Sequence, residues 1–513
     1  MRRGFGSVEF NWGQRGAPSL IFANPTRKKT LTPLNPTLPL RRITDKTHSK
    51  AWDTHMIESL KHLAHATRTH DALAQQFSDL APPLTARQAA IEASRCLYCY
   101  DAPCTRICPS EIDVASFIRN IHDQNINGAA FGILQQNILG GSCARVCPTE
   151  ILCEDACVRN HDAEGQPVKI GLLQRHALDH AHFAAHPFQR APLTGKTIAI
   201  VGAGPAGLSC AHRLALLGND VVIFEAREKS GGLNEYGIAK YKLVDDFAQQ
   251  EVDFLLAIGG IEVRHGRTLG ANLTLHELHA QYDAVFLGLG LNASRQLGLT
   301  GEDAPGLMAA VDYICALRQS SDLAALPVPK RAIVIGAGNT AIDMAVQIKR
   351  LGAEYVTLVY RRGFESMSAT GHEQDIAKAN CVQMRAWAAP QEVLLDAAGR
   401  VRGMCFEETR VEDGRLVGTG VFIEIAADAV FKAIGQSMDA AGLAEPMAQQ
   451  IERRGDKIHV DAQFRTALAG IYAGGDCVAP GQDLTVQAVQ HGKLAAHAIH
   501  HDIQSTAEAA WPT

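Results

Sequence analysis

The stretch KTIAIVGAGPAGLSCAHRLALLGNDVVIFEA, residues 196–226, decides the fold of the chain. An apolar run is followed by a glycine turn, an amphipathic segment and a second apolar run, which is the pattern of a strand, a helix and a parallel strand. The turn reads Gly202-x-Gly204-x-x-Gly207, the spacing of a dinucleotide-binding motif. It predicts a Rossmann-like sheet with a diphosphate at the start of the helix.

The three glycines and an acid in this stretch each have a place in dinucleotide binding. Gly202 permits the tight turn, Gly204 lets a diphosphate approach the backbone, and Gly207 allows the helix to pack on the strand. Glu225 ends the second apolar run, where a carboxylate can accept hydrogen bonds from ribose hydroxyls. Because strand, helix and acid are all present, we favour dinucleotide binding over an ordinary glycine-rich turn.

The stretch RAIVIGAGNTAIDMAVQIKRLGAEYVTLVYRR, residues 331–362, repeats the pattern with an alanine in place of the third glycine. It predicts a second dinucleotide-binding domain. Its second strand ends in Arg361 and Arg362 rather than in an acid, and arginine can pair with the 2′-phosphate of NADPH. These arginines could also be ordinary surface residues. The other residues expected at this site are Gly336, Gly338, Asn339 and Thr340.

Two dinucleotide sites in one chain indicate one flavin and one nicotinamide cofactor. The closing stretch IYAGGD (471–476) ends in Asp476 and is similar to the second FAD motif of flavoproteins with two dinucleotide domains, in which the aspartate holds the ribityl chain. The stretches AVFLGLG (284–290) and AVFKAIGQ (429–436) are similar to the paired crossovers between the two domains of such flavoproteins. We therefore expect FAD in the first domain and NAD(P)H in the second. As an alternative, Asp476 could be a turn residue alone.

Eight of the 13 cysteines fall between residues 96 and 157. The others are isolated, so the chain lacks the cysteine pair that disulfide reductases of this architecture carry beside the flavin, and electrons need another exit. The two groups read C-x2-C-x4-C-x3-C-P and C-x3-C-x5-C-x3-C, and short spacings with a proline after the last cysteine are typical of [4Fe–4S] ligation. Structural zinc is the alternative, although zinc sites usually show CxxC pairs with a longer spacer.

Composition narrows the class of protein further. With 513 residues, of which 46% are hydrophobic, the chain can bury several cores. A net charge of −5 disfavours nucleic acid and membrane surfaces, and no apolar run reaches the roughly 18 residues of a membrane helix. Clustered cysteines in a long chain without a recognisable secretory signal indicate a reducing compartment, so we expect a cytoplasmic protein.

The first fifty residues hold ten Lys or Arg and two acids, and we expect residues 1–52 to form a disordered basic extension.

The expected fold class is α/β, with an N-terminal all-helical iron–sulfur domain followed by two Rossmann-like dinucleotide-binding domains. The NAD(P)H domain is expected to split the FAD domain. The predicted domains are residues 53–190 (helical, [4Fe–4S]), 191–309 (FAD, first part), 310–428 (NAD(P)H) and 429–505 (FAD, second part). Between the cysteine groups, helical spacing is found for Val114, Phe117, Ile118 and Ile121.

From about residue 55 onward the chain resembles the family of the small, electron-input subunit of glutamate synthase. The stretches SRCLYCYDAPCTRICP (94–109), NILGGSCARVCPTEILCEDACVR (137–159) and KIGLLQRHA (169–177) are most similar, within that family, to NAD(P)-dependent dihydropyrimidine dehydrogenase subunits. Glutamate synthase small subunits share the first stretch but usually lack an equivalent of Cys143. The resemblance implies FAD, NAD(P)H and two [4Fe–4S] clusters, and no side-chain acid or base for hydride transfer.

The resemblance also implies a ligand set that the spacing alone leaves open. It implies that the fourth ligand of the second cluster is the amide oxygen of Gln174 and that Cys143 is a neighbour of this cluster. The residues themselves do not decide whether Cys143 or Gln174 is that ligand. The implied ligands are Cys96, Cys99, Cys104 and Cys157 for one cluster, and Cys108, Cys147, Cys153 and Gln174 for the other. Ser368 stands where the NADPH-using animal enzyme has a further basic residue, so we expect NAD(P)H without a choice between the two.

In this family the chain would take hydride from NAD(P)H onto FAD and pass electrons through the clusters. The implied partner is a catalytic subunit with FMN and iron–sulfur clusters that reduces uracil or thymine to the 5,6-dihydropyrimidine. Three alternatives remain. They are the small subunit of glutamate synthase, a stand-alone NAD(P)H:ferredoxin-type reductase, and a non-enzymatic redox or nucleotide sensor with structural zinc.

Overall fold

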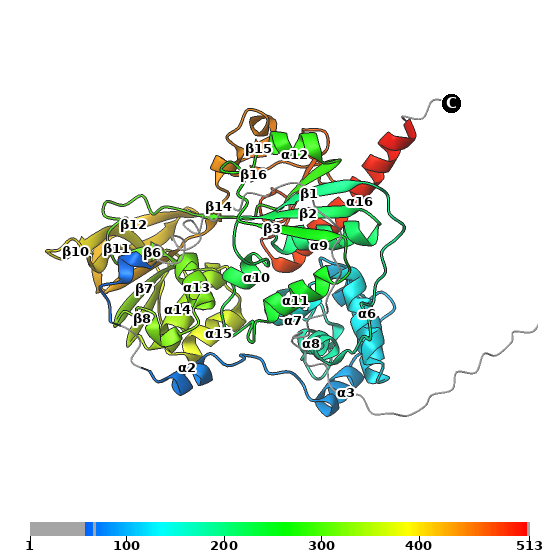
Figure 1. Ribbon diagram of the computed structural model, residues 1–513. Coiled ribbons are helices and arrows are strands. Elements are labelled where there is room, and N and C mark those ends of the chain that lie inside the picture. Colours follow the sequence, from blue (N-terminus) through cyan, green and yellow to red (C-terminus); the bar gives the residue numbers. More distant parts are fainter. Residues whose placement is uncertain (1–56, 65–67, 510–513) are drawn as a thin grey trace, which may run out of the picture.

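The computed structural model describes residues 57–64 and 68–509, which form one helical unit and two α/β units (Figure 1). The predicted basic extension, residues 1–52, lies outside the described residues. None of the helices in the described part of the chain is both long enough and apolar enough to span a bilayer.

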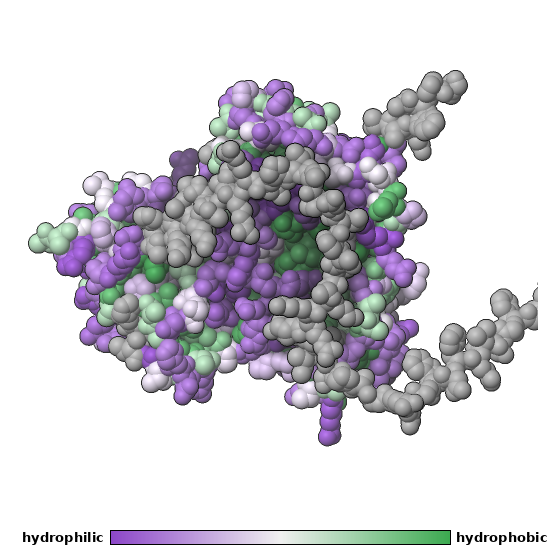
Figure 2. Space-filling model, viewed as in Figure 1, coloured by the Kyte–Doolittle hydropathy of each residue, from purple (hydrophilic) through white to green (hydrophobic). Residues whose placement is uncertain are grey.

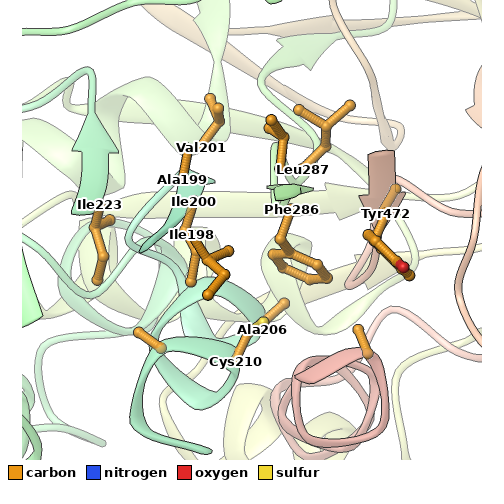
Figure 3. Close-up of a cluster of buried hydrophobic side chains, with 14 of the residues drawn as sticks. Ile198, Ala199, Ile200, Val201, Ala206, Cys210, Ile223, Phe286, Leu287 and Tyr472 are labelled. Atoms are coloured by element: carbon orange, nitrogen blue, oxygen red, sulfur yellow. The ribbon is translucent and has the colours of Figure 1, made fainter. Parts of the chain in front are cut away.

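The first α/β unit contains a five-stranded parallel sheet with the order β17-β4-β1-β2-β3. Helices α9 (Pro205–Leu216) and α16 (Thr485–Ala509) pack side by side against it. Phe286 points from the sheet toward Ala206 of α9, within a core of fully buried aliphatic residues (Figure 3). On the face shown in Figure 2, a hydrophobic area set among hydrophilic residues lies over β3 and α9. The strands are β1 (Thr197–Val201), β2 (Asp220–Glu225), β3 (Ile261–His265), β4 (Ala284–Leu287) and β17 (Ile471–Ala473).

The second α/β unit contains a parallel sheet with the order β6-β13-β7-β8-β9. Val430 of β13 lies opposite Leu307 of β6 on one side and Ile333 of β7 on the other. Helix α14 (Asn339–Leu351) opens after β7, and α13 (Ala310–Gln319) and α15 (Gly371–Ala379) pack against α14. The strands are β6 (Leu307–Ala309), β7 (Arg331–Gly336), β8 (Tyr355–Val359), β9 (Gln383–Arg385) and β13 (Ala429–Ala433).

This sheet corrects the domain division made from the sequence. Residues 307–309 and 429–433 were assigned to the FAD segments, but their backbone hydrogen bonds belong to the second sheet. The chain enters the second unit at β5 (Ala293–Ser294), before the predicted boundary at 309/310, and leaves it at β14 (Gln436–Ser437), after the predicted boundary at 428/429; β5 and β14 pair antiparallel. The apolar run 429–433 is therefore a central strand of the second sheet, and the crossover follows it.

A three-stranded antiparallel sheet, which the sequence analysis did not predict, is inserted between β9 and β13. It extends from the second unit toward the left of Figure 1 and packs through Met404 and Phe406 against Ile333 and Ile335. Its strands are β10 (Ala388–Leu395), β11 (Val401–Glu412) and β12 (Arg415–Ala426).

The cysteine-rich part of the chain is helical, as predicted. Thr85 and Gln88 form a capping box at the start of α3, and the Asp113 side chain caps α5. The four apolar residues predicted at helical spacing are all buried on α5, which confirms that prediction. The helices are α3 (Ala86–Ser94), α4 (Pro103–Ile107), α5 (Val114–His122), α6 (Ile126–Gln136), α7 (Gly140–Val146) and α8 (Ile170–His180).

The segment before α3 packs on the second α/β unit rather than on the cysteine-rich helices. Leu73 of α2 (His70–Gln76) and Phe77 are part of the core of that unit. Arg350 of α14 donates a hydrogen bond to the carbonyl of Gln76 at 2.8 Å. The N-terminal part of the described chain therefore joins the helical unit to the second sheet.

The close crossing of α9 and α16 leads to a testable prediction. A Cβ atom at Gly492 would lie 2.1 Å from the carbonyl oxygen of Ala206, so Gly492→Ala must push the two helices apart. We expect it to destabilise the chain by about 1–3 kcal/mol, measured as a fall in the urea midpoint or Tm. Gly132→Ala on α6 is the control, because a Cβ there meets nothing within 4 Å; it is expected to stabilise by up to about 1 kcal/mol. Equal stability of the Gly492→Ala protein and the parent would contradict the crossing.

Candidate redox centre

The first cysteine group lines a single pocket in the helical unit. Cys96 and Cys99 follow α3, Cys104 lies in α4, and Cys157 comes from a segment more than fifty residues later. Apart from Arg159, the remaining side chains around the pocket are apolar, and they include Ile118 of α5. Thiolates that surround a small apolar pocket are the donor set of an iron–sulfur cluster. The four residues that the resemblance assigned to one cluster are therefore brought together.

The thiols of this pocket are hard to ionise without a cation. Burial, together with the neighbouring Cys157 and Cys96, raises the pKa of the Cys104 thiol to about 11. Burial also raises the pKa of Cys96. Thiolate ligands need the positive charge of a metal to remain deprotonated at neutral pH. These donors therefore fit a bound group that contains metal cations.

The second cysteine group lies next to the first. A hydrogen bond with the Cys143 side chain raises the pKa of Cys147 well above its ordinary value, and burial and the nearby Cys153 and Cys108 add to that effect. Burial likewise raises the pKa of Cys153, to which Cys108 and Cys104 are close enough to contribute. Cys108, Cys147 and Cys153 are thus neighbours, as the implied ligand set requires.

The choice between Cys143 and Gln174 concerns two buried residues on adjacent helices. Cys143 lies in α7 and contacts Cys147 one turn later. Gln174 of α8 donates from Nε2 to the carbonyl of Gly140 at 2.8 Å, which fixes its amide and leaves Oε1 for another partner. In the described part of the chain, no three His, Cys, Asp or Glu side chains surround a point that could hold a single metal ion.

The glycine turn after β1 has the shape of a diphosphate cradle. Gly202 has a φ of +100°, and a Cβ there would lie 2.3 Å from the carbonyl oxygen of Gly288. A Cβ at Gly207 would lie 1.9 Å from the carbonyl oxygen of Gly202. At Gly204 a Cβ would meet only Gly232, at 3.8 Å, so open space remains at the N-terminus of α9. The backbone therefore leaves no room for a side chain at Gly202 and Gly207, and the open space at Gly204 fits a phosphate.

Glu225 and Asp476 are the two acids expected at this cradle. The Glu225 carboxylate accepts hydrogen bonds from the backbone N–H of Ala203 at 2.7 Å and of Arg227 at 2.8 Å, which holds it beside the turn. Asp476 follows β17, and its Oδ1 is buried without a hydrogen-bond partner among the described residues. Burial and the nearby Asp483 raise the pKa of Asp476 to about 6. A buried acceptor without a donor fits the hydroxyl of a bound ligand.

His491 is a residue of this site that the sequence analysis missed. Its Nδ1 accepts a hydrogen bond from the backbone N–H of Gly475 at 3.2 Å, next to Asp476. Burial lowers the pKa of His491 to about 4, so the ring is neutral at physiological pH. It therefore positions the glycine turn before Asp476 without adding charge.

The second glycine turn has the same construction. Gly336 has a φ of +151°, and a Cβ there would lie 2.2 Å from the carbonyl oxygen of Ala433. Gly338 faces the hydroxyl of Ser368, which lies 3.4 Å from the position of a Cβ. Asn339, the first residue of α14, has a buried Oδ1 without a hydrogen-bond partner among the described residues. Thr340 is the second residue of the same helix. These residues fit a second dinucleotide.

Arg361 and Arg362 follow β8, at the same end of the sheet as this turn. Both are exposed, and neither forms an ion pair with a carboxylate of the described residues. Their guanidinium groups can therefore receive a phosphate, and the alternative that they are ordinary surface residues stays open.

The helical unit docks on the first α/β unit through α7. Glu251 of α11 (Phe247–Leu256) accepts hydrogen bonds from the backbone N–H of Gly141 at 2.8 Å and of Ser142 at 3.0 Å. Burial raises the pKa of Glu251 to about 7. Arg145 of α7 stacks on Phe247 at 3.6 Å from the ring centroid. The helix that leads to Cys147 is therefore fixed against the first α/β unit.

Family comparisons agree with this construction. Residues 73–185 match the family described as dihydropyrimidine dehydrogenase domain II, 4Fe-4S cluster, and residues 196–492 match pyridine nucleotide-disulphide oxidoreductase. The fold and the site define a flavin- and nicotinamide-dependent oxidoreductase with a 4Fe-4S domain. FprA of Mycobacterium tuberculosis in complex with NADPH has the same fold over 63% of this chain and 88% of its own, with a TM-score of 0.52 and 19% identity.

Curated relatives narrow the family. The NAD-dependent dihydropyrimidine dehydrogenase subunit PreT of Escherichia coli is 34% identical over 431 residues, which cover 83% of this chain and 97% of the relative. The PreT protein of Salmonella typhimurium matches to the same extent. The glutamate synthase [NADPH] small chain of E. coli is 32% identical and covers 60% of this chain and 68% of the relative. The chain belongs to the family of NAD-dependent dihydropyrimidine dehydrogenase subunits and is an NAD-dependent oxidoreductase.

A cysteine substitution tests the first metal site. We expect Cys99→Ser to lose about half of the iron of the anaerobically purified chain, because one of two four-iron clusters would be missing. NAD(P)H-dependent reduction of a dye by the flavin should persist. Cys381→Ser is the control, since Cys381 is exposed and far from both groups in sequence. Full iron content in the Cys99→Ser chain would contradict the assignment.

The two arginines can be tested with the two nicotinamide cofactors. For the Arg361→Ala, Arg362→Ala double variant we expect about a tenfold rise in the KM for NADPH, equivalent to the loss of one charge-assisted contact, and a smaller rise for NADH. Arg385→Ala is the control, because Arg385 ends the neighbouring strand but is paired with Glu408 at 2.7 Å. Equal effects on both cofactors would mean that the pair does not contact a 2′-phosphate.

Proposed function

We propose that the chain is the electron-input subunit of a dihydropyrimidine dehydrogenase. It takes a hydride from NAD(P)H onto FAD and passes electrons through two [4Fe–4S] clusters to a catalytic partner that reduces uracil or thymine to the 5,6-dihydropyrimidine. The observation that carries the proposal is the pocket formed by Cys96, Cys99, Cys104 and Cys157, next to a second cysteine group on a unit docked against the flavin cradle.

Residues of this chain have a binding role at each step of the proposed electron route. FAD, when bound, accepts two electrons together and releases them singly. The Gly202 turn and α9 hold its diphosphate, Glu225 accepts from a ribose, and Asp476 accepts from a hydroxyl at the other end. The Gly336 turn and Asn339 hold the nicotinamide dinucleotide. Hydride transfer between the two cofactors needs no side-chain acid or base.

The cysteine groups complete the route. We assign Cys96, Cys99, Cys104 and Cys157 to the first cluster, and Cys108, Cys147, Cys153 and Gln174 to the second. The second group is on the flavin side, since α7 is held by Glu251. The first group is on the outer side, where Leu97, Tyr100 and Ile107 are exposed by 56%, 106% and 46%. Exposed apolar residues beside an outer cluster suit contact with an electron-accepting protein.

The proposed partner catalyses the reduction of the pyrimidine, a step that we assign to no residue of this chain. The relatives are named as subunits of a dehydrogenase, and we propose an FMN- and iron–sulfur-containing catalytic subunit as the acceptor. The second candidate is the small subunit of glutamate synthase, which the 32% identity to the E. coli small chain supports. That function would use the same route to a different, amidotransferase partner.

An anaerobic pull-down of the tagged chain from its native cells distinguishes these functions. We expect a flavin- and iron–sulfur-containing subunit to be retained, and the complex to oxidise NAD(P)H when uracil or thymine is added. A very large partner with activity on glutamine and 2-oxoglutarate would indicate glutamate synthase. Recovery of the chain alone, active with added ferredoxin, would contradict both subunit functions and indicate a free reductase.

A further inference from the structure

Lys493 of α16 crosses from the flavin unit into the helical unit. Its side chain is 7% exposed, and its Nζ donates to the carbonyl of Ser110 at 2.9 Å and to Gln136 Oε1 at 3.0 Å. The nearest carboxylate oxygen is that of Glu111, at 3.8 Å, and its side chain is 71% exposed. A solvated carboxylate at that distance compensates a buried ammonium only weakly. Burial lowers the pKa of Lys493 to about 8, so it remains mostly protonated at neutral pH.

The backbone that Lys493 contacts belongs to the segment of a proposed cluster ligand. Ser110 is fully buried and follows Cys108 by two residues, and its Oγ lies 3.5 Å from Cys108 Sγ. Asn137 donates to the same Oγ at 3.4 Å. The ammonium of Lys493 therefore binds the backbone of the loop that carries Cys108.

The other end of α16 lies at the flavin site. The helix begins at Thr485, shortly after Asp476, and packs along α9. Gln490, three residues before Lys493 and on the same side of the helix, has a buried Oε1 without a hydrogen-bond partner among the described residues. One rigid helix thus links the flavin cradle to the second cysteine group.

We propose that Lys493 is a positioning residue for electron transfer: it fixes the Cys108 loop on the flavin unit, and its charge raises the reduction potential of the second cluster. The proposal rests on the ligand set given above, in which Cys108 holds that cluster. The step affected would be the transfer of one electron from reduced FAD to the oxidised cluster, whose Fe4S4 core would go from 2+ to 1+ while Lys493 keeps its protons. A buried cation stabilises the more negative state, and hydrogen bonding and charge near the sulfurs set the potential.

Arg213 provides a matched control that separates an effect on docking from an effect on the potential of the cluster. It lies on α9 of the flavin unit, and its Nη2 donates to the carbonyl of Gln135 at 2.7 Å. Arg213 and Lys493 therefore both bind the C-terminal end of α6, where cations are favoured. Only Lys493 also binds Ser110. Loss of Arg213 should weaken docking without changing the potential of the cluster.

The test uses the full chain, purified anaerobically with FAD and iron, in redox titrations monitored by electron paramagnetic resonance. We expect Lys493→Gln, which keeps a donor but removes the charge, to lower the midpoint potential of the second cluster and leave that of the first. Rapid-mixing experiments should show that its reduction by NAD(P)H is slower by about tenfold or more. Lys493→Arg should retain the parent midpoint, and Arg213→Gln should retain both midpoints.

An unchanged second midpoint in Lys493→Gln would overturn the proposal, as would an equal shift in Arg213→Gln. If the Lys493→Gln chain loses its iron, the Gln136→Glu variant serves as the second test, because it places a carboxylate beside the ammonium and keeps the lysine. That variant is expected to lower the same midpoint, and an unchanged value would overturn the role of Lys493. A parent chain without a second cluster signal would overturn the ligand set and this role together, so the two failures are distinguishable.

Discussion

The hydrogen bonds between Glu251 and the start of α7 are the contact on which the proposed electron route depends. Two backbone N–H groups at the start of that helix have no intrahelical partner, and the carboxylate of the flavin unit accepts from both. Leaving such groups buried and unpaired costs about 1–3 kcal/mol each. The helical unit therefore docks in one orientation, and that orientation brings Cys147 to the flavin side. A surface made of apolar residues alone would not fix the orientation in this way.

The apolar cores extend across the unit boundaries and reinforce this docking. Leu134, Ile138 and Leu139 of the helical unit belong to the same buried cluster as the first sheet. Leu60, Leu73 and Phe77 belong to the cluster of the second sheet. No unit of the described chain is thus covered by its own residues alone. Distances between cofactor sites in such a structure are set by folding.

Sequence patterns could predict the parts of the site that depend on local backbone shape. The glycines of both turns and the apolar face of α5 are recognisable because neighbouring residues decide their conformation. The hairpin of β11 and β12 has a similar local signal, since Asp413-Gly414, with φ angles of +49° and +75°, is a typical hairpin turn and is recognisable from its sequence. Lys493 and Glu251 could not be predicted in this way. Their partners lie 383 and 110 residues away, and only the packed units bring them together.

The second α/β unit is held on more than one side. It is joined to the flavin unit through the β5–β14 pair, where Arg295 also contacts the carbonyl of Gln436. Lys242 forms buried ion pairs with Asp343 at 2.8 Å and with Glu373 at 2.6 Å. The segment around α2 crosses its other side, and Thr370 donates a hydrogen bond to Glu150 of the helical unit. A large rotation of this unit would break buried ion pairs, which is costly. If FAD and NAD(P)H bind at the two glycine turns as proposed, the folded chain therefore sets their relative positions, and turnover would need no swinging domain to time it.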